Sequence, residues 1–257
     1  MNEYPRVISL AYRIGSDGLH EYAQDAELEG RLRDFAFRLR HRDAEFTPLI
    51  GFANEENARG ALEPQLRAWE LAASLVHGQG VLHFSFATAH IQREAPRPGI
   101  AAELHAVTAF FQGGVLRPTL TLHEHPRPPD GFVVDECVEI LGEQFLRARA
   151  RPEMLLTLAY SMTTCLDYYF EGPAGAAARL AISQNVLGEI RKLANTRGVG
   201  AHARKFDGKG QRQPLCQGER EWLLRMLELI VRRAAAAAAN TPVGEQITLE
   251  KMPLWGG

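Results

Sequence analysis

The residues best suited to bind a ligand lie in one basic, glycine-rich segment, residues 189–212. Its cations are opposed only by Glu189 and Asp207, which leaves the segment at +5 and the rest of the chain at −7. The cations are Arg191, Lys192, Arg197, Arg204, Lys205, Lys209 and Arg212. A cluster of like charges is stabilised by an anion nearby. Arginine accounts for 25 of the chain's 29 cations, yet three of its four lysines lie here, so composition bias does not explain the cluster.

Four glycines in the same segment strengthen the prediction of an anion site. Gly198, Gly200, Gly208 and Gly210 let backbone N–H groups turn toward an anion. Phosphate, from RNA, DNA or a nucleotide, is the anion that this combination predicts. The predicted phosphate-binding residues are Arg191, Lys192, Gly198, Gly200, Arg204, Lys205, Lys209 and Arg212. The alternative is a solvated polar loop whose cations pair with acidic residues of the N-terminal half.

Arg197 and His202 are separated by four residues and follow the third of four predicted helices. This arrangement resembles the Arg-x(4–6)-His motif of HEPN domains, which are helical bundles that often dimerise. The resemblance covers about residues 131–239 and implies a metal-independent endoribonuclease of bacterial stress or phage defence. It implies that His202 is the general acid/base and that Arg197 stabilises charge on the scissile phosphate. The whole chain is also similar to bacterial proteins that pair a small α+β half with a helical half, a similarity that supplies no activity.

A non-enzymatic function is the alternative hypothesis. The basic segment would then be a docking surface for a protein partner, and the N-terminal half would bind a partner of its own. A third hypothesis is a metal site made of histidines. His123 and His125 would lie on one face of a strand, since side chains alternate along it. If a hairpin turns at Gly113-Gly114, His105 lies near His123 on the neighbouring strand, and three histidines could bind a divalent metal. No carboxylate motif accompanies these histidines, so we expect neither a metal nor another cofactor.

The composition excludes several classes of protein. The net charge of the 257 residues is −2, which excludes a protein that is basic throughout. No run of 18 apolar residues predicts a membrane span, and the first 15 residues lack the pattern of a signal peptide. Cys137, Cys165 and Cys216 have no zinc-site spacing and are expected to be reduced thiols, Cys137 and Cys165 on apolar helix faces. These features favour a cytoplasmic protein, and a homodimer follows from the family resemblance.

The elements that would position these residues fall in two halves, separated by the proline-rich break at 126–131. Alternating apolar residues predict strands at 6–14, 35–39, 46–52 and 81–92, and a hairpin of 104–111 with 119–124. Pro48 suggests that 46–52 is an edge strand. A helical stripe predicts one long helix, Glu55–His77, capped by Asn54 and either kinked or restarted at Pro64.

Beyond the break the apolar period changes to that of helices, predicted at 134–148, 152–170, 183–194 and 218–239. Four helices with one apolar face each are best satisfied as a bundle. We therefore predict an α+β protein: an N-terminal antiparallel sheet with one long helix, followed by a C-terminal four-helix bundle. The predicted domains are 1–127 and 131–240, with a tail at 241–257 that packs through Ile247, Leu249 and Trp255.

Overall fold

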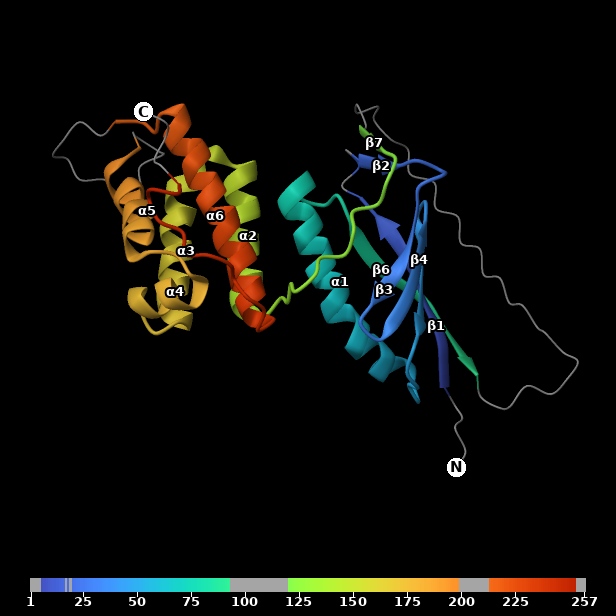
Figure 1. Ribbon diagram of the computed structural model, residues 1–257. Coiled ribbons are helices and arrows are strands. Elements are labelled where there is room, and N and C mark those ends of the chain that lie inside the picture. Colours follow the sequence, from blue (N-terminus) through green and yellow to red (C-terminus); the bar gives the residue numbers. More distant parts are fainter. Residues whose placement is uncertain (1–5, 17, 19, 93–119, 199–212, 253–257) are drawn as a thin grey trace, which may run out of the picture. The chain divides into compact units, whose positions relative to one another are not determined.

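The structure is a computed structural model that describes residues 6–16, 18, 20–92, 120–198 and 213–252. The chain divides into two compact units, Met1–Pro128 and Pro129–Gly257. The fold is α+β, with an antiparallel sheet and one long helix in the first unit and helices in the second (Figure 1). Each unit has its own buried core.

The sheet of the first unit has five antiparallel strands in the order β3-β4-β5-β1-β6. They are β1 (Arg6–Gly15), β3 (Glu27–Leu32), β4 (Phe35–Arg40), β5 (Asp43–Pro48) and β6 (His83–Gln92). Phe35, Phe37 and Leu39 of β4 are buried, whereas Arg38 and Arg40 between them are exposed. The polar face is crossed by exposed ion pairs such as Arg40–Glu27, at 2.9 Å. Such pairs contribute little stability, so burial of the apolar face holds the sheet.

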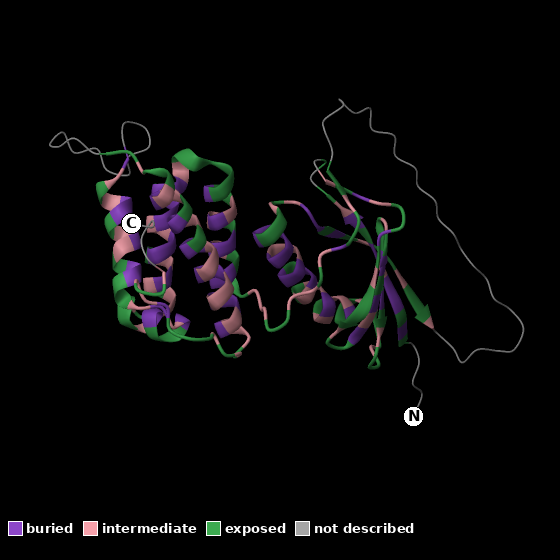
Figure 2. Ribbon diagram, turned by 45° about the horizontal axis from the view of Figure 1, so that its top comes forward, coloured by how far each residue is buried: buried purple, intermediate pink, exposed green. Residues whose placement is uncertain are grey.

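Helix α1 (Glu55–His77) lies along the apolar face of the sheet (Figure 1). The Asn54 side chain caps it by accepting a hydrogen bond from the Asn57 N–H over 2.8 Å, as predicted. Trp69 is fully buried, packs edge-on against Phe37 and at a tilt against Phe84, and donates its indole N–H to the Pro126 carbonyl. Figure 2 shows buried and exposed residues around this helix. Pro64 lies inside one continuous helix, so it neither ends α1 nor starts a second helix.

Two short strands, β2 (His20–Tyr22) and β7 (Leu120–Leu122), form a separate parallel pair. The predicted strand at 119–124 therefore ends at Leu122. The other half of the predicted hairpin, 104–111, and its turn at Gly113-Gly114 lie outside the described residues.

The second unit has five α-helices in the residues described between 129 and 252. They are α2 (Glu136–Ala150), α3 (Leu155–Tyr169), α4 (Pro173–Leu180), α5 (Gln184–Thr196) and α6 (Gln217–Ala238), with a short 3₁₀ turn, η1 (Pro152–Met154), before α3. Helix α3 contacts α2, α4, α5 and α6. The four predicted helices match α2, α3, α5 and α6 within a few residues, whereas α4 was not predicted, and a four-helix bundle is not confirmed.

The end of helix α4 and the residues that follow it are held by hydrogen bonds from two other segments. The Arg233 guanidinium of α6 donates to the carbonyls of Leu180 and Ala181, at 2.9 and 2.7 Å. Ile247, from the segment after α6, exchanges backbone hydrogen bonds with Ala181 and Ser183, both at 2.8 Å. The predicted packing of Ile247 is therefore present in the structure, since its side chain is also buried.

The prediction for Pro48 was wrong. Strand β5 lies between β4 and β1 in the middle of the sheet, not at its edge. Pro48 is the last residue of β5 and lies opposite Phe35. A proline at the end of a strand interrupts no further ladder hydrogen bonds, so a central position is compatible with it.

Candidate anion-binding site

The basic segment begins where helix α5 ends. Arg197 is the C-cap residue of α5, and its backbone N–H donates to the Leu193 carbonyl over 3.0 Å. Gly198 follows with φ of 99°, a conformation that favours glycine. Its N–H donates to the Gln213 carbonyl over 3.0 Å, and Arg197 and Gln213 form a parallel β-bridge. These contacts hold together the two ends of residues 199–212.

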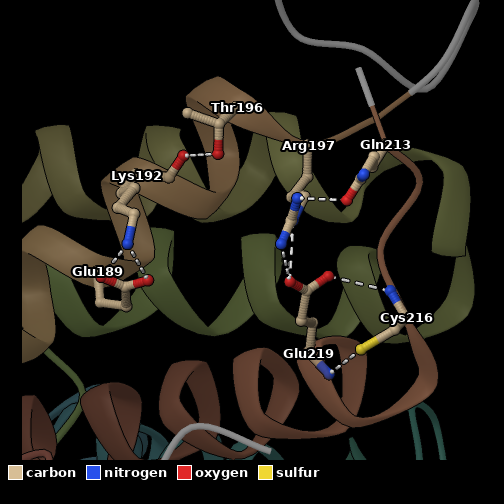
Figure 3. Close-up of polar contacts among 7 residues, drawn as sticks. All are labelled: Glu189, Lys192, Thr196, Arg197, Gln213, Cys216 and Glu219. Carbon is tan, nitrogen blue, oxygen red and sulfur yellow. Dashed lines mark hydrogen bonds and ion pairs between the residues drawn. The ribbon is translucent and has the colours of Figure 1, made fainter. Parts of the chain in front are cut away.

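The Arg197 side chain binds a buried carboxylate on the next helix (Figure 3). Its Nε donates to Oε1 of Glu219 over 2.8 Å, and its Nη2 lies 2.6 Å from the same oxygen. Its Nη1 donates to the side-chain oxygen of Gln213 over 3.2 Å. The exposed fractions of the Arg197 and Glu219 side chains are 29% and 3%. Arg197 is therefore the counter-ion of a carboxylate that is almost completely excluded from water.

Glu219 has a second function in the first turn of α6. Its Oε2 accepts a hydrogen bond from the Cys216 N–H over 3.0 Å, and the Cys216 sulfur accepts one from the Glu219 N–H over 3.4 Å. This reciprocal pair is a capping box, which stabilises a helix N-terminus. Both carboxylate oxygens of Glu219 are thus satisfied, one by Arg197 and one by the helix cap.

The next two predicted phosphate-binding cations are also paired. Arg191 of α5 donates to Asp167 of α3 over 2.6 Å and to the Thr163 carbonyl over 3.4 Å. Lys192 binds Glu189 one turn earlier on the same helix, at 3.0 Å. The Lys192 side chain is 65% exposed, whereas that of Arg191 is 23% exposed. Of these two cations, Lys192 is the one that solvent reaches more easily.

The remaining predicted residues lie outside the described part of the chain. They are His202, Gly200, Arg204, Lys205, Lys209 and Arg212. The structure therefore brings together Arg197 and Gly198 at the base of the segment and places Arg191 and Lys192 on α5.

The paired cations change where the excess charge of the segment resides. Arg191, Lys192 and Arg197 each have an acidic partner within the second unit. The other four cations belong to residues 199–212, which contain Asp207 as their one acidic residue. The excess positive charge of the basic segment therefore belongs to residues 199–212, whose net charge from the sequence is +3. These residues are the remaining candidate anion site.

A pocket of about 110 Å³ lies beside Gly198. Its apolar wall consists of Pro152, Leu156, Pro214 and Leu215, from η1, α3 and the residues before α6. Glu153 and Arg220 supply one charge of each sign. The pocket therefore places a guanidinium and an apolar surface next to the base of the basic segment.

The histidine arrangement considered for a metal is not formed by His123 and His125. The strand ends at Leu122, and His123 is exposed, whereas His125 is 3% exposed and stacks on Tyr22 with ring centroids 4.2 Å apart. Burial lowers the pKa of His125 to about 4, which keeps the imidazole neutral. His105 lies outside the described residues, and among those described no three His, Cys, Asp or Glu side chains converge as a metal site.

The sequence prediction missed Glu219 and Gln213, which hold Arg197 in place. A local signal did exist for Glu219, because Cys216 and Glu219 have the spacing of a capping box. No local signal connects Arg197 with Glu219, which are 22 positions apart. Their contact depends on how α5 and α6 pack.

A scan against protein-family models and searches of curated proteins and of solved structures found no match. The HEPN resemblance therefore depends on the Arg197–His202 spacing and the predicted helices alone. In the part of the chain that the structure describes, no helix has the length and apolar character needed to cross a membrane.

Proposed function

We propose that residues 199–212, anchored between α5 and α6, bind the phosphate groups of RNA or a nucleotide. The observation that carries this proposal is the pairing of Arg191, Lys192 and Arg197 with acidic residues of the second unit. The acids Asp167, Glu189 and Glu219 already form ion pairs with these cations. They are therefore poor counter-ions for the four cations of the segment, which are Arg204, Lys205, Lys209 and Arg212. A phosphate backbone supplies the negative charge that these four cations require.

The anchored base of the segment supports the same proposal. Gly198 and Gln213 close the connection through a backbone hydrogen bond, and Arg197 ties it to the first turn of α6. Fixing the ends of a loop reduces the conformational entropy that is lost when the loop orders around a ligand. The pocket beside Gly198 adds an apolar surface and Arg220, which suit a base or sugar next to a bound phosphate.

Within this proposal the protein is a metal-independent endoribonuclease with His202 as the general acid/base. Arg197 would contribute to the scissile phosphate through the N–H groups that Glu219 and Gln213 leave unused, since a guanidinium carries five donors. Its exposed fraction of 29% leaves part of the group accessible. The attacking group would be the 2′-hydroxyl of the RNA itself, so the expected product carries a 2′,3′-cyclic phosphate.

Binding can be tested by fluorescence anisotropy with a labelled single-stranded RNA over a series of salt concentrations. The variant Arg204→Glu/Lys205→Glu is expected to lose at least about tenfold in affinity. If each cation meets one phosphate, the slope of log affinity against log salt should fall by roughly 1.4. A matched control reverses Arg147 and Arg225, which are exposed on α2 and α6, and should keep the affinity within about threefold.

Catalysis is tested separately with His202→Ala. This variant should bind RNA as the natural chain does but cleave it about 10²–10⁴ times more slowly. Chelators should not alter the rate. If the natural chain binds no RNA or nucleotide at low salt, or if its affinity does not depend on salt, the proposal is wrong and the docking hypothesis takes its place.

The docking hypothesis makes a different prediction for the same two variants. A protein partner would be lost on reversing Arg204 and Lys205, whereas His202→Ala would leave its binding unchanged. Pull-down with each variant therefore separates an RNA-directed site from a protein-docking surface.

A further inference from the structure

The second unit contains a pair of cysteines that sequence separation hides. Cys137 lies in the first turn of α2 and Cys165 near the end of α3, and these two helices pack against each other. Their thiols hydrogen-bond to each other. Neither is in a disulfide. From the sequence alone, packing on apolar helix faces accounts for both cysteines, because 28 positions separate them.

The two thiols differ in their surroundings. Cys137 is 4% exposed, whereas Cys165 is partly exposed. The hydrogen bond with Cys165 raises the pKa of the Cys137 thiol, and burial raises it further. The same hydrogen bond lowers the pKa of Cys165. Cys165 is therefore the thiol of the pair that ionises first, and the thiolate is the reactive form.

Solvent reaches Cys165 directly, because this thiol is partly exposed. A small, uncharged oxidant such as hydrogen peroxide can therefore meet it. A hollow of about 60 Å³ lies beside the other thiol and is lined by Cys137 together with Asp135, Val138, Phe170 and Arg179. Cys216, the third cysteine, is exposed and caps α6, away from this hollow.

We propose that Cys137 and Cys165 are a peroxide-sensitive dithiol that closes to a disulfide between α2 and α3. The Cys165 thiolate attacks one oxygen of the peroxide, the O–O bond breaks, and hydroxide leaves, giving Cys165 sulfenic acid. The Cys137 sulfur then attacks the Cys165 sulfur, the S–O bond breaks, and the Cys137 proton leaves with that oxygen as water. Overall two thiols lose two electrons and one peroxide becomes two waters.

The test uses the full chain carrying Cys216→Ser, since serine is a good N-cap and this change removes the third thiol. After treatment with hydrogen peroxide and blocking of remaining thiols, we expect one crosslinked peptide pair joining Cys137 to Cys165, and a mass lower by two hydrogens. The disulfide should move the urea midpoint of the second unit upward, because it closes a loop and so lowers the conformational entropy of the unfolded chain. A thiol reductant should reverse both changes.

Two further variants identify the order of events. With Cys137→Ala added, the Cys165 sulfenic acid has no resolving thiol and should be trapped by dimedone. With Cys165→Ala added, trapping at Cys137 should be at least tenfold slower. The proposal is overturned if the crosslink forms only in denaturant or only between two copies of the chain, or if peroxide leaves both thiols open to alkylation in the folded protein.

Discussion

Arg197 links the end of α5 to the beginning of α6 through a carboxylate that water barely reaches. The family resemblance predicted Arg197 as a catalytic residue that stabilises charge on the scissile phosphate, but its nearest partner is Glu219 at 2.6 Å. A cation that neutralises a buried acid affects stability as well as function. Loss of activity on mutation of Arg197 would therefore not by itself identify a catalytic group.

Arg197→Ala should lower the free energy of unfolding of the second unit by about 3 kcal/mol, because it leaves the Glu219 carboxylate buried without a counter-ion. Adding Glu219→Gln should recover more than half of that loss, since the glutamine oxygen still accepts from the Cys216 N–H and carries no charge. Urea denaturation of the single and double variants measures the coupling between the two residues. Equal losses in Arg197→Ala and the double variant would show that the charge of Glu219 is not the reason.

His125 makes stability of the first unit depend on pH. Burial lowers its pKa from 6.5 to about 4 in the folded chain. Between these values the unfolded chain binds a proton that the folded chain does not, so stability is complete above pH 6.5 and falls as pH drops toward 4. The loss from this group is on the order of 3 kcal/mol.

Unfolding of the natural chain and of His125→Phe at several pH values tests this prediction. The variant should lose less stability between pH 6.5 and 4, because phenylalanine keeps the contact with Tyr22 and takes up no proton. His123→Gln is the matched control, since His123 is exposed two positions away, and its pH profile should follow that of the natural chain. Parallel profiles for the natural chain and His125→Phe would contradict the prediction.

At the scale of elements, a helix or strand can be predicted from sequence when its large apolar residues fall on one face and its polar residues on the other. The helices α1 and α5 combine a polar cap, Asn54 or Ser183, with a clear apolar stripe, and both were predicted. Helix α4 was missed because its apolar residues are mostly alanines. Strand β3 was missed because Glu, Gly and Arg dominate it and none of its residues is buried. Its pairing with β4 comes from backbone hydrogen bonds and cross-strand charges, which local patterns do not reveal.

The candidate site divides in a similar way. The basic segment, its glycines and its position between two helices could be predicted, because they are local features of sequence. The ion pairs Arg197–Glu219 and Arg191–Asp167 could not, because each joins different helices across 22 and 24 positions. Pairing of this kind depends on tertiary packing.

The close packing of β3 against β4 leads to a prediction about Gly30. Gly30 lies opposite Phe37, and a Cβ at this position would lie 2.8 Å from the Phe37 ring. The ring is buried against Trp69 at 5.1 Å, so it cannot move away freely. Gly30→Ala should therefore lower the free energy of unfolding by about 1–2 kcal/mol.

Gly60→Ala is the matched change within the same unit. A Cβ at Gly60, inside α1, meets no atom within 4 Å. Alanine favours the helix over glycine, so this variant should gain about 0.5–1 kcal/mol. Thermal unfolding of both variants should therefore give shifts of opposite sign, and shifts of the same sign would contradict the steric explanation.

At the scale of the whole molecule, each unit contains a core and a tryptophan that reports on it. Trp69 lies in the core of the first unit and Trp222 in that of the second. We expect fragments 1–128 and 129–257 to unfold cooperatively when expressed separately. In the full chain, Arg197→Ala should shift only the transition of the second unit, and His125→Phe only that of the first, as followed by fluorescence. One shared transition that both variants move equally would show that the units do not fold independently.

The backbone hydrogen bond between Gly198 and Gln213 also suggests that residues 199–212 can be exchanged for another sequence. This bond and the Arg197–Glu219 ion pair fix the distance between the two ends of the segment. We therefore expect the packing of α5 and α6 not to depend on the residues that connect them. Loop closure costs rise only slowly with length, by about 0.6 kcal/mol for each doubling. Replacing 199–212 with a Gly/Ser linker of equal length should thus change the urea midpoint little while removing phosphate binding. The same position would accept a foreign binding loop, which makes the helical unit a scaffold for engineered recognition.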